Sequence, residues 1–550
     1  MICQFCGHNN QPGVRFCSKC GGQFPEMPAD GAGTAGRADV KGSVNNVVGM
    51  FKALPLKKLL IIAASVIVVI VAAVIFIPML GGSSVDIRKD SISLFFDGDL
   101  IIISGNNNAK FTIDGEYHSV QRSLDGSKAA ILTDLRSSTG GTLWFVTTSG
   151  VQQVADDVVD YLLSDTGRGL VYMTDYDDRN FSAELYLYET SSKKSTRITD
   201  EAYSNVYDMI GVCISPNGKS VSYTSDYDSR ENEYTGYILV DGKSPEKLGT
   251  NTHAVAISDG GRHLYYVKES SDGRSTSLHI RSGRNENRLI PDIIQDPALR
   301  LNKDYSQVIY NMDGRSYVSQ NGGERIRVGG SSIRGFILPR GAQVGGNSDA
   351  ATVYGLRSFA NNVIRNEDGL AYMDSSYETN RISSTSDNAS RAVISDNGKT
   401  LLYVTNNGHL SAIDPTRQNA ERREIGRDVL SFAASNDAKT IYFINDDEEL
   451  YCAKGNGLPS KISDDVYSGY LALPQGTTRV FFLVDYSSRR NTGELHFSNN
   501  GGRRTKVAGG DDVMRVWATA TSAFYTTIDS DVFRSNGNEK FSLFAEDIRG

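Results

Sequence analysis

Four cysteines near the start of the chain have the spacing of a metal site. Cys3, Cys6, Cys17 and Cys20 form two Cys-x-x-Cys pairs with ten residues between them. Each pair places two thiolates on one edge of a tight turn, and two such turns facing each other make a tetrahedral zinc site. A disulfide needs an oxidising compartment, and a thioredoxin-like redox site has one such pair beside a βαβ pattern. We therefore expect residues 1–24 to hold one structural Zn²⁺.

The same segment resembles the short zinc-ribbon domains that begin many bacterial membrane proteins, through "CQFCGHNN" and "FCSKCGGQF". The resemblance implies a structural metal with no open coordination position, so His8 is a bystander. Arg15 and Lys19 are the only charged side chains of residues 1–24, and the −2 of a four-thiolate zinc centre cancels their charge. Phosphate binding needs a surplus of positive charge. We therefore expect a cytoplasmic protein, rather than nucleic acid, as a partner of the ribbon.

Residues 25–58 form the connection that follows the ribbon. Residues 25–42 are rich in Gly, Ala, Pro and Asp and lack a periodic apolar pattern, which is typical of a flexible linker. A short apolar face follows, with Val44, Val48 and Phe51 at helical spacing, and it ends before Pro55. This segment is either an amphipathic helix in the headgroup layer or a simple tether.

Residues 59–80 read "LLIIAASVIVVIVAAVIFIPML" and contain no charged side chain. These 22 residues are long enough for a helix that crosses a hydrocarbon core of about 30 Å. A cleavable signal peptide has a basic start and an apolar run of only about 7 to 15 residues. Here 58 residues precede a longer apolar run. We therefore expect a transmembrane helix in the lipid bilayer that acts as an uncleaved signal anchor.

Charge predicts how this helix is oriented. Residues 1–80 carry seven Lys or Arg and three Asp or Glu, a net charge of +4, which leaves −12 for the rest of the chain. Lys57 and Lys58 stand directly before the apolar run, and Arg88 and Lys89 oppose them weakly. Basic residues favour the cytoplasmic side. We therefore expect the amino terminus in the cytoplasm, where zinc is stable on the cysteines, and the carboxyl-terminal region outside the cell membrane.

The long region after a connection at 81–91 contains an internal repeat. One phrase, seen as "SPNGKSVSYTSD" or "SDNGKTLLYVTN", begins at residues 123, 164, 215, 258, 302, 395, 435 and 474. The spacings are 41, 51, 43, 44, 93, 40 and 39 residues, so the interval of 93 holds two units, one of them eroded. Most units begin with a turn that needs a positive φ, and a strand of alternating β-branched and aromatic residues follows. A period of about 40 residues with several strands predicts propeller blades.

The phrase is similar to the WD40-like repeat of TolB-type β-propellers, and "ISPNGKSVSY" (214–223) and "ISDNGKTLLY" (394–403) match it best. The resemblance covers residues 92–548 and implies a mainly β fold, a degenerate β-propeller. The number of units exceeds the usual four to eight blades. Either two propellers are present, or residues 331–390 are an insertion in one large propeller.

Three loops at the far ends of repeat strands share a second phrase: "DYDDR" (175–179), "DYDSR" (226–230) and "DYSSR" (485–489). The candidate binding residues are Asp175, Tyr176, Arg179, Asp226, Tyr227, Arg230, Asp485, Tyr486 and Arg489. Either the aspartate starts the turn while tyrosine and arginine cover a neighbouring blade, or tyrosine and arginine contact a partner. Calcium held by Asp175, Asp177 and Asp178 is a third interpretation, without the twelve-residue loop pattern of a known site.

No recognisable catalytic motif accompanies the repeats. The chain has no G-x-S-x-G motif, and the histidines after His8 are scattered singly. We therefore expect no enzyme but a membrane-anchored protein whose propeller binds a protein or a wall polymer of the cell envelope. The alternatives are a signalling protein that couples the propeller to a cytoplasmic partner and, third, an extracellular hydrolase. Cys213 and Cys452 lie in strand-like stretches, where buried free thiols are the default and a disulfide is the minor alternative.

Overall fold

The computed structural model describes residues 91–542 with short gaps. The gaps are 97–98, 105–106, 113–115, 137–139, 205–208, 210, 271–274, 284, 294–297, 340–341, 343, 347–349, 384–390, 508–509, 519–522, 529–531 and 536–539. The predicted zinc ribbon, linkers and membrane helix before residue 91 lie outside the described residues. Within those residues the fold is mainly β, with one short 3₁₀ turn, η2 (Asp259–Gly261).

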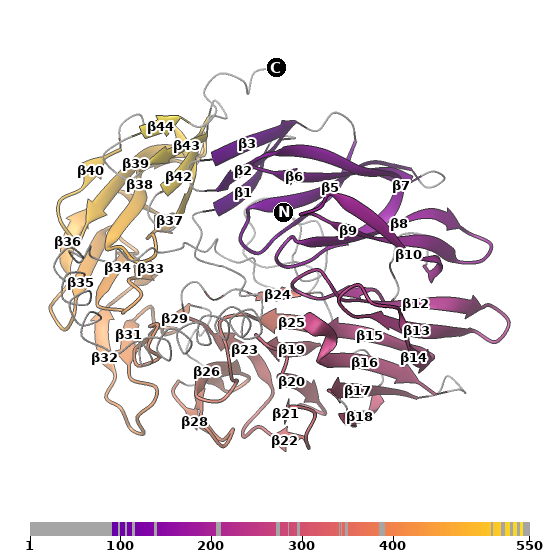
Figure 1. The fold of residues 1–550 in the computed structure, drawn as a ribbon. Coiled ribbons are helices and arrows are strands. Elements are labelled where there is room, and N and C mark those ends of the chain that lie inside the picture. The colour runs from indigo at the N-terminus through magenta and orange to yellow at the C-terminus, as the bar shows by residue number, and fades with distance from the viewer. Residues whose placement is uncertain are drawn as a thin grey trace, which may run out of the picture. The chain divides into compact units, whose positions relative to one another are not determined.

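The strands follow one another in antiparallel meanders (Figure 1). The first sheet contains β1 (Ser91–Phe96), β2 (Asp99–Ser104) and β3 (Asn107–Thr112). The second contains β4 (Tyr117–Arg122), β5 (Lys128–Arg136), β6 (Gly140–Thr147), β7 (Gly150–Leu163), β8 (Gly169–Asp177), β9 (Ser182–Glu189), β10 (Lys194–Tyr203), β11 (Cys213–Ile214), β12 (Val221–Asp228), β13 (Glu233–Leu239) and β14 (Glu246–Thr250).

Long strands join the meanders of this second sheet. The first half of β7 pairs with β6 and its second half, from Val158, pairs with β8. Likewise β10 pairs with β9 and, through Ala202, with β12. Each of these two strands, β7 and β10, is therefore the last strand of one meander and the first strand of the next.

Later meanders are mostly separate sheets. They contain β15 (Thr252–Ile257), β16 (His263–Glu269), β17 (Thr276–Ser282) and β18 (Asn285–Ile293); β19 (Leu299–Asn302), β20 (Gln307–Met312), β21 (Arg315–Gln320) and β22 (Ile326–Arg327); and β23 (Ile333–Ile337), β26 (Asn362–Asn366), β27 (Gly369–Met373) and β28 (Thr379–Arg381). Then come β29 (Ala392–Ile394), β30 (Leu401–Val404), β31 (Leu410–Ile413) and β32 (Arg423–Gly426); and β33 (Val429–Ala434), β34 (Thr440–Asn445), β35 (Leu450–Lys454) and β36 (Ser460–Ser463). The last sheet joins β37 (Val466–Ala472), β38 (Arg479–Ser487), β39 (Thr492–Asn499) and β40 (Thr505–Lys506) to β41 (Val513–Ala518), β42 (Ala523–Thr527), β43 (Val532–Ser535) and β44 (Lys540–Ser542).

The sheet β23-β26-β27-β28 answers the question raised by the spacing of 93 residues. It is a full four-stranded meander within residues 333–381, so the eroded repeat unit is present. The segment 331–390 is therefore more than an insertion. A smaller hairpin, β24 (Val344–Gly346) and β25 (Ala350–Val353), lies between β23 and β26 along the chain and pairs with the preceding sheet.

The core lies between consecutive sheets. Ile337 and Val363 of one sheet share a buried cluster with Leu401 and Tyr403 of the next. Sheets further along pack in the same way, through Tyr442 against Phe482 among other side chains. One small sheet cannot bury both of its own faces, so each meander covers its neighbour as propeller blades do. This arrangement confirms the expected propeller-type β fold and explains why all of "LLYV" in β30 is buried.

The repeated turn phrase is held by hydrogen bonds of its own side chains. Ser435 Oγ accepts from the Thr440 backbone N–H at 3.0 Å and donates to Asp437 Oδ1 at 2.6 Å. Positive φ values follow at the fourth position, as expected, at Gly167, Gly218 and Gly398, and at Ala438 where the glycine is replaced. Backbone bonds join several of these turns to the next, as from Leu124 N–H to Asp165 O at 2.8 Å and from Asp396 N–H to Asn436 O at 2.9 Å. The phrase therefore fixes both a hairpin and the contact between neighbouring meanders.

Candidate functional site

The three "DY" phrases form the same bulge at the ends of β8, β12 and β38. Asp175, Asp226 and Asp485 have φ values of 53°, 55° and 50°, in the left-handed region. At each of these points the register with the partner strand shifts, as between Thr174 and Asp177 of β8. Aspartate tolerates this conformation better than most residues. The aspartates therefore bend the strand end before the hairpin, a more specific role than starting a turn.

The tyrosines of the bulges are half-buried and pack on the preceding strand. Tyr227 stacks on Tyr203 of β10 with ring centroids 4.2 Å apart, and Phe181 meets the Tyr227 ring edge-on at 5.9 Å. Tyr486 stacks in the same way on Tyr467 of β37 at 3.7 Å. Burial, more than Tyr467, raises the pKa of Tyr486 to about 12. Tyr176 packs against an apolar cluster instead of a stacked ring.

A further tyrosine, Tyr234 of β13, also stacks on Tyr203, with ring centroids 5.8 Å apart. Its hydroxyl lies 2.8 Å from His253 Nδ1 and donates to Glu269 Oε1 at 3.2 Å. The stacked tyrosines therefore end in a polar cluster that includes His253 of β15 and Glu269 of β16.

The arginines of the three phrases are exposed. Arg179, Arg230 and Arg489 lie in the hairpin loops, and none of them forms an ion pair with another described residue. The first two instead close the loop through the backbone, since Arg179 N–H donates to Asp177 Oδ1 at 2.9 Å and Arg230 N–H to Asp228 Oδ1 at 2.8 Å. The former bond lowers the pKa of Asp177. The guanidinium groups are therefore free to contact a partner, whereas the carboxylates beside them organise the loops.

Sequence reasoning missed the stacking partners. Tyr203 and Tyr467 occupy matching places, one residue after Ala202 and Val466, which pair with Ser225 and Val484. The strings "EAY" and "DVY" before the repeat turns were the available signal. A fourth bulge, at Asp134 with a φ of 54°, was missed because leucine follows this aspartate instead of tyrosine.

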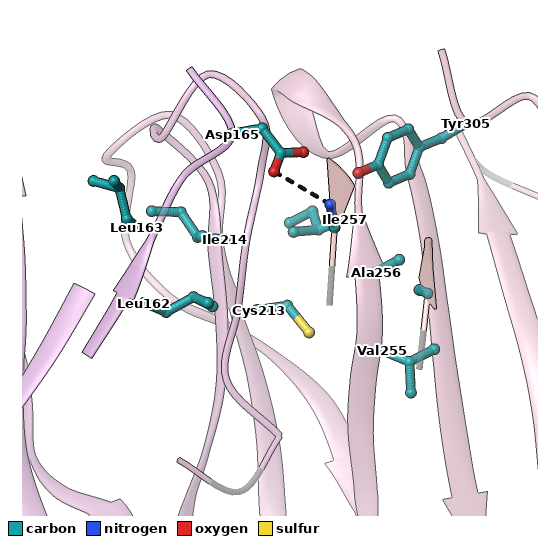
Figure 2. Close-up of a pocket in the computed structure, with 11 residues that line it drawn as sticks. Leu162, Leu163, Asp165, Cys213, Ile214, Val255, Ala256, Ile257 and Tyr305 are labelled. Atoms are coloured by element: carbon teal, nitrogen blue, oxygen red, sulfur yellow. Dashed lines mark hydrogen bonds between the residues drawn. The ribbon is translucent and has the colours of Figure 1, made fainter. Parts of the chain in front are cut away.

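A second candidate site is a small cavity at the ends of several strands (Figure 2). Its volume is about 50 Å³. The walls come from the ends of β7, β11 and β15, from the turn after β19, and from the β24–β25 hairpin. Most wall residues are apolar, such as Leu162, Ile214 and Val255, whereas Asp165 and the hydroxyl of Tyr305 supply polar groups.

Asp165 is the carboxylate among the residues that line this cavity. Its Oδ2 accepts a hydrogen bond from the Tyr354 hydroxyl, and its Oδ1 accepts from Gly346 N–H at 3.2 Å. The residue is only partly buried, yet the surrounding protein desolvates the carboxyl group and raises its pKa. The two hydrogen bonds oppose this shift, and the nearby Asp259 adds to it. Sequence reasoning did not single out Asp165, because Tyr354 is 189 residues away in the chain.

The two later cysteines are buried free thiols, as expected. Cys213 lines the cavity, and its Sγ lies 3.1 Å from Ala254 O. Cys452 lies in β35, in another cluster, where burial raises its pKa.

Metal and membrane predictions fall mostly outside the structure. Cys3, Cys6, Cys17 and Cys20 precede the described residues, as does the apolar stretch 59–80. Among the residues that are described, no three His, Cys, Asp or Glu side chains are grouped to hold a metal ion, Asp175, Asp177 and Asp178 included. In the same part of the chain, no helix has the length and apolar character of a membrane span.

No protein-family model and no curated protein sequence matches the chain. Among solved structures, the tricorn protease is similar at 12% identity and a TM-score of 0.25, over 83% of this chain and 62% of that one. TolB from Acinetobacter baumannii is similar at 15% identity and 0.26, over 46% and 62%. The β-propeller domain of the Trilobed protease from Pyrococcus furiosus is similar at 8% and 0.27, over 64% and 98%. The chain thus spans less than two thirds of the tricorn and TolB chains, and likeness at this level assigns no shared activity.

Proposed function

We propose that the chain is a single-pass membrane protein that binds a protein or a wall polymer of the cell envelope through its propeller region, without catalysis. The observation that carries the binding role is the repeated bulged hairpin. It places an exposed arginine, which has no ion pair among the described residues, beside a half-buried tyrosine at the ends of β8, β12 and β38. Arginine and tyrosine are enriched among the residues that dominate binding energy.

The anchoring part of the proposal rests on sequence. The uncharged stretch 59–80 with Lys57 and Lys58 before it supports a helix whose amino-terminal side is cytoplasmic. In that compartment the four cysteines would hold one structural Zn²⁺, and the ribbon would be free to bind a cytoplasmic protein. Elemental analysis of the purified chain should give one zinc per molecule, and a Cys17→Ser variant should lose it. A wild-type chain without zinc would contradict this part.

Site-specific photo-crosslinking in the native membrane tests the binding face. A photoreactive residue placed at Asp178 or Ser229 stands in an exposed hairpin loop, whereas one at Lys219 stands exposed at the opposite end of β12. We expect a discrete adduct from the first two positions and none from Lys219. Adducts of equal yield at Lys219, or none at the hairpins, would refute the assignment.

A paired substitution separates binding from folding. Replacing Arg179 and Arg230 with alanine should remove the adduct while the melting temperature stays the same, because substitutions of exposed side chains change the free energy of unfolding by no more than about 0.5 kcal/mol. The matched control replaces the exposed Arg168 and Lys219 at the other ends of β8 and β12. That control should retain the adduct.

A further inference from the structure

The hairpin between β8 and β9 contains an aromatic residue that its backbone conformation disfavours. Each of the three "DY" hairpins ends in a four-residue loop whose last residue has a positive φ. That residue is Phe181 with a φ of 53°, Asn232 with 53° and Asn491 with 55°. Asparagine is enriched in this left-handed region, whereas a bulky side chain is strained there. The first hairpin therefore has phenylalanine where the other two have the favoured residue.

Phe181 is also exposed to solvent, to 37%. Its ring meets Tyr227 of β12 edge-on at 5.9 Å, and Tyr227 stacks on Tyr203 of β10. The contact joins the first hairpin to the hairpin of the next meander and leaves part of the Phe181 ring open. Strained residues persist where function requires them. The exposed ring is therefore a candidate contact for a partner.

The loops around this ring are negatively charged. Residues 175–181 and 226–232 together contain six carboxylates and two arginines, a net charge of −4. None of these charged groups forms an ion pair with another described residue. The matching residues of the third hairpin, 485–491, contain one aspartate and two arginines, a net charge of +1. We call Phe181, Tyr227 and the first two stretches the β8–β12 surface, because the third hairpin shares neither its charge nor its phenylalanine.

We propose that the β8–β12 surface docks a basic segment of a partner protein, with a lysine or arginine side chain of that segment against the Phe181 ring. A cation is attracted to the face of an aromatic ring, and complementary charge steers the partner to the surface. The net negative charge repels an acidic protein or an anionic wall polymer. Arg179 and Arg230 contact acceptor groups of the same segment, such as backbone carbonyl oxygens. This inference rests on the proposed binding function and names the class of its partner.

Charge reversal tests the sign of the partner. The photoreactive residue stands at Ser229 in native membranes, and the exposed Asp178 and Glu231 are both replaced with lysine. We expect the yield of the adduct to fall at least about fivefold, and the wild-type yield to fall as salt is added, because salt screens exposed charges. The matched control replaces the exposed Glu421 and Asp446 of other sheets with lysine. It changes the net charge equally and should keep the wild-type yield.

A second variant, Phe181→Asn, tests the ring. It introduces the residue that stands at the matching place of the second hairpin, so the melting temperature should stay within about 2 °C of the wild-type value. The yield of the adduct at Ser229 should fall at least about fivefold, because an aromatic anchor is lost. A melting temperature that falls together with the yield would show that Phe181 only supports Tyr227, and would overturn the proposal.

The outcomes separate this inference from the binding role on which it rests. An adduct that increases on charge reversal would indicate an acidic partner, and an unchanged adduct would indicate a neutral one. Either result, or an adduct in which mass spectrometry finds no peptide, would overturn the basic protein segment and leave the binding role intact. A wild-type chain that forms no adduct at Ser229 would refute the binding role itself.

Discussion

At the scale of single residues, backbone conformation explains the aspartates of the "DY" phrases. One interpretation of the sequence was that each of these aspartates starts a turn, because aspartate favours turns. It did not predict that Asp175, Asp226 and Asp485 lie in the left-handed region within a strand. That conformation depends on the partner strand, which supplies one residue where the bulged strand supplies two.

This conformation makes a prediction at Asp485. Asp485→Gly should change the free energy of unfolding by less than about 0.5 kcal/mol, because glycine adopts a φ of 50° without a steric penalty. Asp485→Val should destabilise by about 1–2 kcal/mol, since a β-branched residue is strained there. Urea denaturation of both variants measures the difference, and Ser488→Val in the adjacent exposed loop serves as the control. Equal losses for glycine and valine would show that the lost carboxylate matters and the conformation does not.

At the scale of elements, the repeated strands and turns were predictable because the phrase carries its own hydrogen bonds. The serine, the following Asp or Asn, and the residue of positive φ act within six positions. The pairing of β24 and β25 with the sheet of β19 was not predictable. "VGG" and "AATV" of β24 and β25 have no clear strand pattern, and their pairing depends on β19, some 50 residues earlier. The partner of Asp165 was hidden for the same reason.

The stacked tyrosines give a prediction for the hairpin of β12 and β13. A double-mutant cycle of Tyr203→Leu and Tyr227→Leu should show a coupling energy of about 0.5–1.5 kcal/mol, because the rings stack at 4.2 Å. The matched cycle pairs Tyr203 with Tyr237, which stacks on Tyr223 instead. Thermal or urea unfolding measures each variant. Coupling that is equal in the two cycles would mean that the Tyr203–Tyr227 contact has no special weight.

At the scale of the whole molecule, the period of the repeat identified the propeller-type fold, and the interval of 93 residues correctly implied a further unit. The reason is that each meander must cover its neighbour, so the core-forming residues recur at a fixed period. Function does not follow from that period. The residues that distinguish one meander from another, such as the arginines of three hairpins or Asp165 beside Tyr354, depend on position in the fold.

The placement of the chain across the membrane is the prediction with the widest consequence. Because basic residues concentrate before residues 59–80, a reporter active only in the cytoplasm should work when fused before residue 50 and fail when fused after residue 550. Replacing Lys57 and Lys58 with glutamate should weaken this preference, while the same change at Arg88 and Lys89 should strengthen it. Reporter activity at the carboxyl terminus of the wild-type chain would place the propeller in the cytoplasm. The proposed zinc site would then face an oxidising compartment, and disulfides would become the expected state of Cys3, Cys6, Cys17 and Cys20.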